Sequence, residues 1–125
     1  MENMYKVECL NLRAAVKAIY RFMTNPLLIR PECTIWDKDG MSSTIVNTGV
    51  NFMAESDLFR RIIRTEIVSI SCVAATDLAD TRRVAFAYMS GVDFMVLTFP
   101  QSNGKLSDAE RKIVEDMRNH NELFS

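Results

Sequence analysis

The spacing of apolar side chains predicts three amphipathic helices, over residues 12–23, 56–64 and 107–119. In each segment apolar residues return every three or four positions and charged residues lie on the opposite side, as in a helix that packs one face on a core. Asn11 is a good N-cap for the first helix. Pro26 ends that helix, because the residue before a proline is disfavoured in helical geometry.

Small polar residues mark the starts of the other two helices. Ser56 is expected to cap the second helix, which ends near Arg64. Ser107 and Glu110 have the spacing of a capping box, in which each side chain accepts a hydrogen bond from the other residue's backbone N–H. Residues 120–125 are expected to fray beyond the third helix.

Two pairs of β-prone segments predict hairpins. Residues 33–36 and 41–46 flank Asp37-Lys38-Asp39-Gly40, and an Asp-Gly pair between such segments favours a tight turn. Residues 83–89 and 92–99 flank Ser90-Gly91 in the same way. Each pair is therefore expected to form two antiparallel strands.

Two further segments complete the predicted order of elements. Residues 67–73 could prolong the second helix, but their β-branched content favours a strand. Residues 5–10 alternate apolar and polar side chains and could form a short first strand. The order is roughly αββαβββα, which predicts a single α+β domain over residues 1–125, with about five mostly antiparallel strands and helices packed on the sheet.

Composition and charge exclude several classes of partner. Of the 125 residues 48% are apolar and 25% are charged, as in ordinary globular domains. A net charge of -1 provides no overall field that would attract nucleic acid or an anionic membrane. The longest apolar runs are far shorter than the roughly 20 residues of a membrane-spanning helix. Residues 1–6 lack the basic start and apolar stretch of a secretory signal, so we expect a cytoplasmic protein.

The three cysteines, Cys9, Cys33 and Cys72, are odd in number and widely spaced. This spacing fits neither a disulfide framework nor a metal-binding Cys-x-x-Cys pair, so we expect buried, reduced and unreactive thiols. An enzyme that uses one of them as its nucleophile is the least favoured reading, because no histidine is placed to stabilise a thiolate.

The residues needed for common catalytic sites are missing. The single histidine, His120, lies near the end of the sequence, so Ser-His pairs, Cys-His pairs and imidazole metal sites are not expected. The four glycines do not have the spacing of a nucleotide-binding loop. Asp37 and Asp39 resemble the start of a calcium loop, but Thr48 stands where that loop needs a glutamate, so a turn is favoured. We therefore expect no catalytic residue, metal or cofactor.

Arginines provide the main alternative site. Arg60 and Arg64 are one helical turn apart and could hold the same anion, and Arg82 and Arg83 add a second basic pair. If the two pairs converge, they would bind a small ligand or anion. The competing explanation is a solvated surface whose basic residues are neutralised by nearby acidic ones.

Surplus apolar strand surface supports the leading hypothesis, a non-enzymatic interaction or adaptor protein. Residues 94–99 are apolar on both sides, which requires cover from helices on both faces or from a second subunit. The expected interaction surface includes Trp36, Phe94, Met95 and Phe99. Its partner would be another protein or a second copy of the chain, most simply in a homodimer.

Residues 34–41, with the sequence TIWDKDGM, resemble the first hairpin of Roadblock family proteins, and the order of elements over residues 12–119 is similar to that family's order. The resemblance implies a dimerising, non-catalytic scaffold that binds small GTPases or motor and signalling complexes. The chain departs from the family in its second helix, which is long in the family and is expected to end near Arg64 here.

Overall fold

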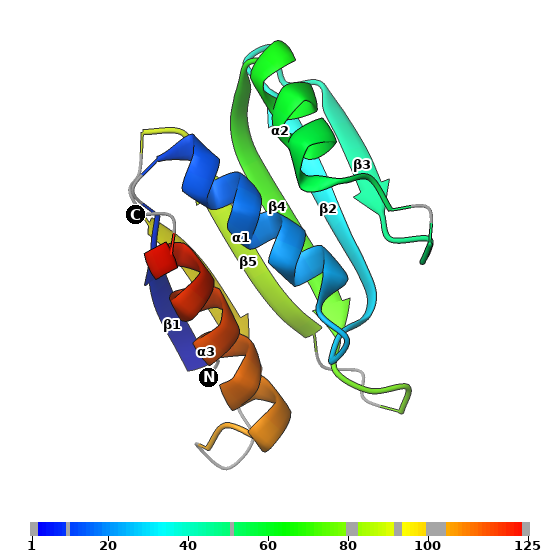
Figure 1. Ribbon diagram of the computed structural model, residues 1–125, viewed down its shortest axis with the longest axis vertical. Coiled ribbons are helices and arrows are strands. Elements are labelled where there is room, and N and C mark those ends of the chain that lie inside the picture. Colours follow the sequence, from blue (N-terminus) through cyan, green and yellow to red (C-terminus); the bar gives the residue numbers. More distant parts are fainter. Residues whose placement is uncertain are drawn as a thin grey trace.

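A computed structural model describes residues 3–9, 11–50, 52–79, 83–91, 94–99 and 105–123. Within them the strands form one antiparallel sheet of six, in the order β1-β6-β5-β4-β2-β3 (Figure 1). The elements along the chain are β1 (Asn3–Glu8), α1 (Leu12–Thr24), β2 (Ile29–Asp37), β3 (Ser42–Val46), α2 (Glu55–Arg64), β4 (Ile67–Ala75), β5 (Arg83–Met89), β6 (Phe94–Phe99) and α3 (Asp108–Leu123).

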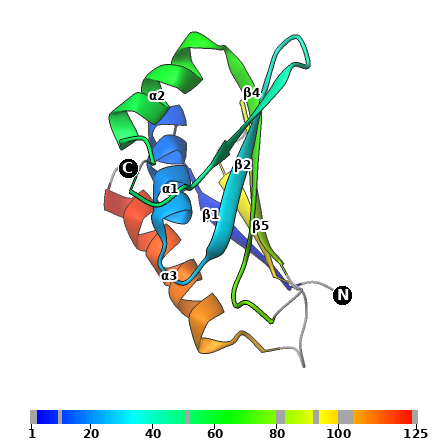
Figure 2. The same ribbon diagram turned by 90° about the vertical axis from the view of Figure 1, so that its right-hand side faces the viewer.

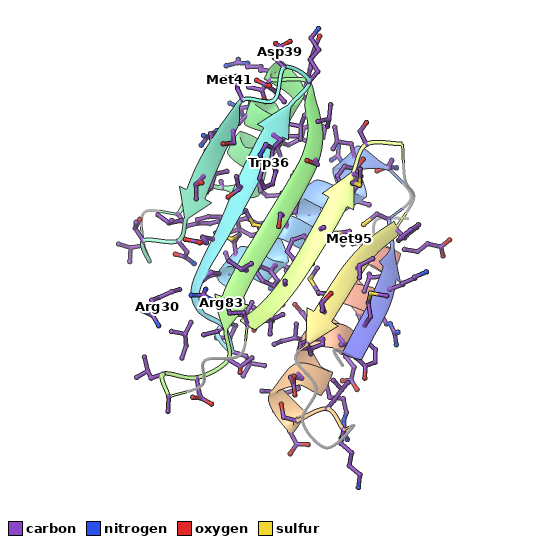
Figure 3. The ribbon with its side chains drawn as sticks, turned by 180° about the vertical axis from the view of Figure 1, so that it is seen from behind. Arg30, Trp36, Asp39, Met41, Arg83 and Met95 are labelled. Carbon is purple, nitrogen blue, oxygen red and sulfur yellow. A yellow bond between two sulfur atoms is a disulfide. The ribbon has the colours of Figure 1, made fainter. Side chains whose placement is uncertain are left out.

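The helices and the sheet form two layers. All three helices of the described residues pack on the same face of the sheet, with α1 between α2 and α3 (Figures 1 and 2). We call the opposite face the open face, because no helix of the described residues lies over it (Figures 2 and 3). The α+β class predicted from the sequence is confirmed. Among the described residues, no helix has the length and apolar character needed to span a membrane.

The sheet has six strands because the first segment joins its edge. β1 pairs antiparallel with β6, and Val7 lies opposite Met95. The ambiguous segment after α2 is a strand, because β4 pairs with β2 on one side and with β5 on the other. Partners on both sides satisfy the backbone hydrogen-bonding groups of β4, and its β-branched residues fit the extended form.

The core lies between the helices and the sheet. α1 contributes the fully buried alanines Ala14, Ala15 and Ala18, whose small side chains let its neighbours approach closely. Larger side chains fill the remaining space, and Phe22 of α1 packs edge-on against Phe86 of β5 with 4.6 Å between ring centroids. α1 is therefore the helix that holds the layers together.

Two of the predicted helix caps are confirmed. The side chain of Asn11 accepts a hydrogen bond from the backbone N–H of Ala14 at 2.9 Å. Ser107 Oγ accepts from the N–H of Glu110 at 3.1 Å, and Glu110 Oε1 accepts from the N–H of Ser107 at 2.8 Å. These reciprocal bonds make the predicted capping box.

The start of α2 and the end of α3 differ from expectation. α2 begins at Glu55, and Ala54 occupies the N-cap position without a side-chain hydrogen bond, so the prediction that Ser56 is the cap was wrong. Glu55 and Asp57 in the first turn complement the helix dipole in its place. α3 continues to Leu123, past the position where fraying was expected.

The turn between β2 and β3 forms where the Asp-Gly pair predicted it. Asp37 Oδ1 accepts hydrogen bonds from the backbone N–H groups of Asp39 at 2.9 Å and Met41 at 3.0 Å. Gly40 has a φ of 81°, which a residue with a side chain rarely adopts. The Asp37 carboxylate thus stabilises the turn that the Asp-Gly pair predicted.

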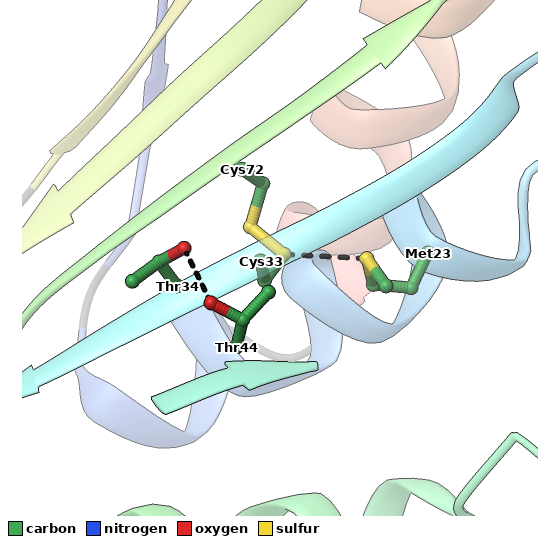
Figure 4. Close-up of a disulfide and its surroundings, with 5 residues drawn as sticks. All are labelled: Met23, Cys33, Thr34, Thr44 and Cys72. Carbon is green, nitrogen blue, oxygen red and sulfur yellow. Dashed lines mark hydrogen bonds between the residues drawn. A yellow bond between two sulfur atoms is a disulfide. The ribbon is translucent and has the colours of Figure 1, made fainter. Parts of the chain in front are cut away.

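A disulfide joins Cys33 of β2 to Cys72 of β4, so the expectation of three reduced cysteines was wrong for this pair (Figure 4). The two residues are direct partners in the β2–β4 register, with 4.0 Å between their Cα atoms. Met23 Sδ of α1 lies 3.3 Å from Cys33 Sγ, which places the bond on the helix side of the sheet. Cys9 remains a free, buried thiol.

Reduction of the disulfide is expected to lower the free energy of unfolding by up to about 4 kcal/mol, because the bond closes a loop of 39 residues in the unfolded chain. Urea unfolding with and without a thiol reductant measures the change. Cys9→Ala should keep the response to reductant and Cys72→Ala should lose it. Thiol titration shows which sample is oxidised and which is reduced. Equal urea midpoints for these two samples would contradict the expectation.

Candidate functional site

The strongest candidate site is a field of uncharged side chains on the open face. Alternation along five strands turns every second residue toward this face. We call these positions the uncharged field: Thr34 and Trp36 of β2; Ser42, Thr44 and Val46 of β3; Ser69, Ser71 and Val73 of β4; Ala85, Ala87 and Met89 of β5; and Phe94, Val96 and Thr98 of β6.

The strand register arranges the field in rows across the sheet. In the middle row, Val96 lies opposite Ala87, Ala87 opposite Ser71, and Ser71 opposite Thr34. The row ends at Thr44, whose hydroxyl lies 3.2 Å from that of Thr34 (Figure 4). The middle row is therefore built from small or short side chains.

Side-chain size changes along the strands. In β2, β5 and β6 the large Trp36, Met89 and Phe94 lie at one end of the field, and Glu32, Ala85 and Thr98 lie at the other end. In β3 and β4 the order is reversed, with Ser42 and Ser69 at the end of Trp36 and the larger Val46 and Val73 at the other. A shallow depression of about 160 Å³ lies beside the small residues of β4, β5 and β6 and is lined by Ser71, Ala85, Phe86, Ala87, Val96 and Thr98.

Charged residues surround the middle row of the field. Lys6 and Glu8 lie on the edge strand β1 and Arg83 at the start of β5, whereas Glu32 of β2 lies within an end row of the field, between Val46 and Val73. The Lys6 ammonium lies over the ring of Phe94, 5.2 Å from its centroid. An uncharged centre with a charged border is the arrangement found in protein–protein interfaces.

The structure divides the predicted interaction residues between the two faces. Trp36 and Phe94 lie on the open face, and 39% of the Phe94 surface is exposed. Met95 and Phe99 have no exposed surface, because alternation along β6 turns them toward the helices. These two residues therefore belong to the core and not to an accessible surface, which corrects the expectation for them.

Sequence reasoning missed the centre of the field. Ser71, Ala85 and Ala87 carry no chemical signature of function, and their importance comes only from lying side by side. The sequence did contain one signal, the lack of charge at alternate positions of β4, β5 and β6. This signal indicates a shared surface only when the sheet order shows that these strands are neighbours.

A second candidate is a basic groove between α1 and α2, with a volume of about 210 Å³. Arg13 and Lys17 line it from α1, and Arg60 lines it from α2. The Arg13 guanidinium lies 5.9 Å from the centroid of the Phe59 ring. The remaining lining residues are Val16, Glu55, Ser56 and Phe59.

Two of the three cations in this groove already have acidic partners. Lys17 Nζ lies 3.3 Å from Glu55 Oε1, and Arg60 Nη1 lies 3.7 Å from Asp57 Oδ1. Both acidic residues belong to the first turn of α2. An anion that enters the groove would therefore compete with these carboxylates for the cations.

Of the arginines predicted to form an anion site, only Arg60 lines this groove. Arg64 is the last residue of α2, and β4 begins three residues later. Arg83 pairs with Ala75 at the far end of β4, about 25 Å along the sheet from its start. The structure therefore keeps Arg64 and Arg83 apart, and Arg82 lies outside the described residues.

The described residues provide neither a reactive free thiol nor a group of metal ligands. Burial raises the pKa of the Cys9 thiol from 9 to about 12, so almost none of it is thiolate at neutral pH. Within the described ranges no three His, Cys, Asp or Glu side chains group in a way that could hold a metal ion. The depression on the open face is lined by residues without an acid or base.

Comparisons with protein-family models, with curated proteins and with solved structures found no match to this chain. The resemblance to the Roadblock family therefore rests on the hairpin at residues 34–41 and on the order of elements. The function has to be argued from the open face and the groove themselves.

Proposed function

We propose that this protein is a non-enzymatic interaction module that binds a protein partner through the open face. The observation that carries the proposal is the uncharged row that crosses five strands at the centre of this face, from Val96 to Thr44. Four charged side chains also point to this face, Lys6, Glu8, Glu32 and Arg83, and none of them lies in that row between β6 and β3. An interface centre without charge and with charged residues around it is suited to being covered by a partner.

The size of the face supports the same conclusion. Six strands at about 4.8 Å spacing, each with about three outward side chains, give a face of about 30 by 20 Å. Covering it would bury about 600 Å² on each partner, or about 1,200 Å² in total, which reaches the lower end of the range for specific interfaces. The face also carries exposed apolar side chains, with Met4 63%, Val46 50% and Met89 59% exposed.

The cellular compartment stays a prediction within this proposal. A cytoplasmic location was expected from the sequence, but disulfides are rare in reducing compartments. The Cys33–Cys72 bond is fully buried beneath α1, so a thiol reductant reaches it only if the core opens. A cytoplasmic protein could keep the bond only through this protection.

A second candidate function is the binding of a small anion, such as a phosphate or a carboxylate, in the basic groove. Three cations converge there around a wall formed by Phe59, and Ser56 adds a hydroxyl. Arginine in particular binds phosphate and carboxylate with paired hydrogen bonds. Arg60 is the residue that this groove shares with the site expected from the sequence.

A photo-crosslinking residue in place of Ala87 is expected to form covalent adducts with a protein partner in living cells, because Ala87 lies in the centre of the uncharged field. The same residue in place of Lys112, which is exposed on α3, serves as the control. Adduct masses are measured after purification under denaturing conditions. Absence of adducts at position 87, or equal adducts at both positions, would contradict the proposed function.

Iodoacetamide at pH 7.5 is expected to leave Cys9 unmodified in the folded, oxidised protein and to alkylate it in urea. The reason is that burial raises the pKa of this thiol to about 12, so it stays protonated at pH 7.5 until the protein unfolds. Intact mass spectrometry follows the reaction. Rapid single labelling of the folded protein would instead support a cysteine nucleophile.

Inorganic phosphate, pyrophosphate or citrate is expected to raise the thermal midpoint if the groove binds anions. The stabilisation would be about 2.7 kcal/mol when the anion concentration is a hundred times the dissociation constant. Arg13→Gln and Arg60→Gln should remove the rise, and Arg83→Gln, at the far end of β4, should retain it. No rise with any of the three anions, or the same rise in all variants, would exclude this function.

A further inference from the structure

We propose that the partner covering the open face is a second copy of this chain, packed face to face about a two-fold axis that crosses the strands along the middle row of the uncharged field. This inference rests on the proposed function and specifies its partner. Each strand would then lie over the same strand of the second copy, running in the opposite direction.

The gradient of side-chain size makes the face complementary to itself. A two-fold axis along the row from Val96 to Thr34 brings the large end of each strand of the field over the small end of the same strand in the second copy. Met89 of one copy then lies over Ala85 of the second copy, Phe94 lies over Thr98, and Trp36 lies over Glu32. The gap between the sheets, about 10 Å in packed β-sheets, is filled evenly in this way.

An axis parallel to the strands would fill the gap less evenly. It would stack Phe94 on Trp36 at the sides of the interface and Ala87 on Ser71 at its centre. The large side chains would hold the sheets apart and leave voids between the small ones, which costs the contacts that stabilise a packed interface. The crossing axis is favoured for this reason.

Charge also permits the face to pack on itself. The middle row has no charge to repel its own copy between β6 and β3, and the residues around it include two basic ones, Lys6 and Arg83, and two acidic ones, Glu8 at the edge and Glu32 in an end row. Lys6 extends the middle row onto β1, and Glu8 lies two residues further along that strand. The crossing axis therefore places the two Lys6 residues together at the edge of the interface, between the Glu8 residues of the two copies.

The oligomeric state of the purified protein tests the partner. Light scattering after size-exclusion chromatography is expected to give about twice the chain mass of 14.3 kDa. Trp36 is the only tryptophan, so its emission should shift to longer wavelength as dilution separates the copies and exposes it. Ala87→Lys should weaken the dimer at least about a hundredfold, because it buries two unpaired charges at the axis. The matched control Lys112→Glu, on α3, should remain a dimer.

Cysteine crosslinking tests the axis. In a Cys9→Ala background, Ala87→Cys should be joined to its own copy by a short bis-maleimide, because this position lies on the axis. Met89→Cys, on the same strand, should not be joined, because the axis carries it to the opposite end of the field. If the Met89→Cys variant is crosslinked and the Ala87→Cys variant is not, the proposed axis is wrong. If the Ala87→Lys variant remains a dimer, the open face is not the dimer interface.

The failure of this inference is distinguishable from that of the proposed function. A monomeric protein whose position 87 still forms adducts of another mass in cells would exclude the second copy and retain the interaction module. A monomer without adducts would exclude both.

Discussion

The two-residue period of the β-strands, combined with helices on one side only, determines both the core and the candidate site. Phe86 points toward α1 and packs against Phe22, so its neighbours Ala85 and Ala87 must point to the open face. A shift of β5 by one residue would bury the alanines and expose Phe86 to solvent. The hydrophobic effect that orders the core therefore also fixes which side chains the open face presents.

Contacts within the helix layer, and between that layer and the sheet, hold the backbone of the open face in place. α1 packs between α2 and α3, and Arg21 of α1 donates a hydrogen bond of 2.6 Å to Asp116 of α3. The Cys33–Cys72 bond links β2 to β4 beneath α1. Because the backbone of the face is held by these contacts, little ordering would accompany binding, and less of the interaction free energy would be lost to entropy.

Local signals in the sequence predicted most of the elements, and contacts between distant segments account for what was missed. Asn11, Ser107 and the Asp-Gly turn act within a few residues, so their roles follow from spacing alone. The Cys33–Cys72 bond depends on the register of two strands separated by β3 and α2, which spacing does not reveal. The sequence showed the alternation of residues 94–99 but not which side of the strand the helices cover. The candidate site was harder to predict, because its alanine and serine residues form a surface only when neighbouring strands bring them together.

The two candidate sites lie on opposite layers of the molecule, so one can be occupied without blocking the other. The uncharged field belongs to the sheet surface, and the basic groove lies between α1 and α2 in the helix layer. Val16 of α1 lines the groove and is buried in the core that supports the sheet. An anion that separates Lys17 from Glu55 would thus act on a helix that packs beneath the open face. Any coupling between the sites would have to pass through α1, because no residue lines both.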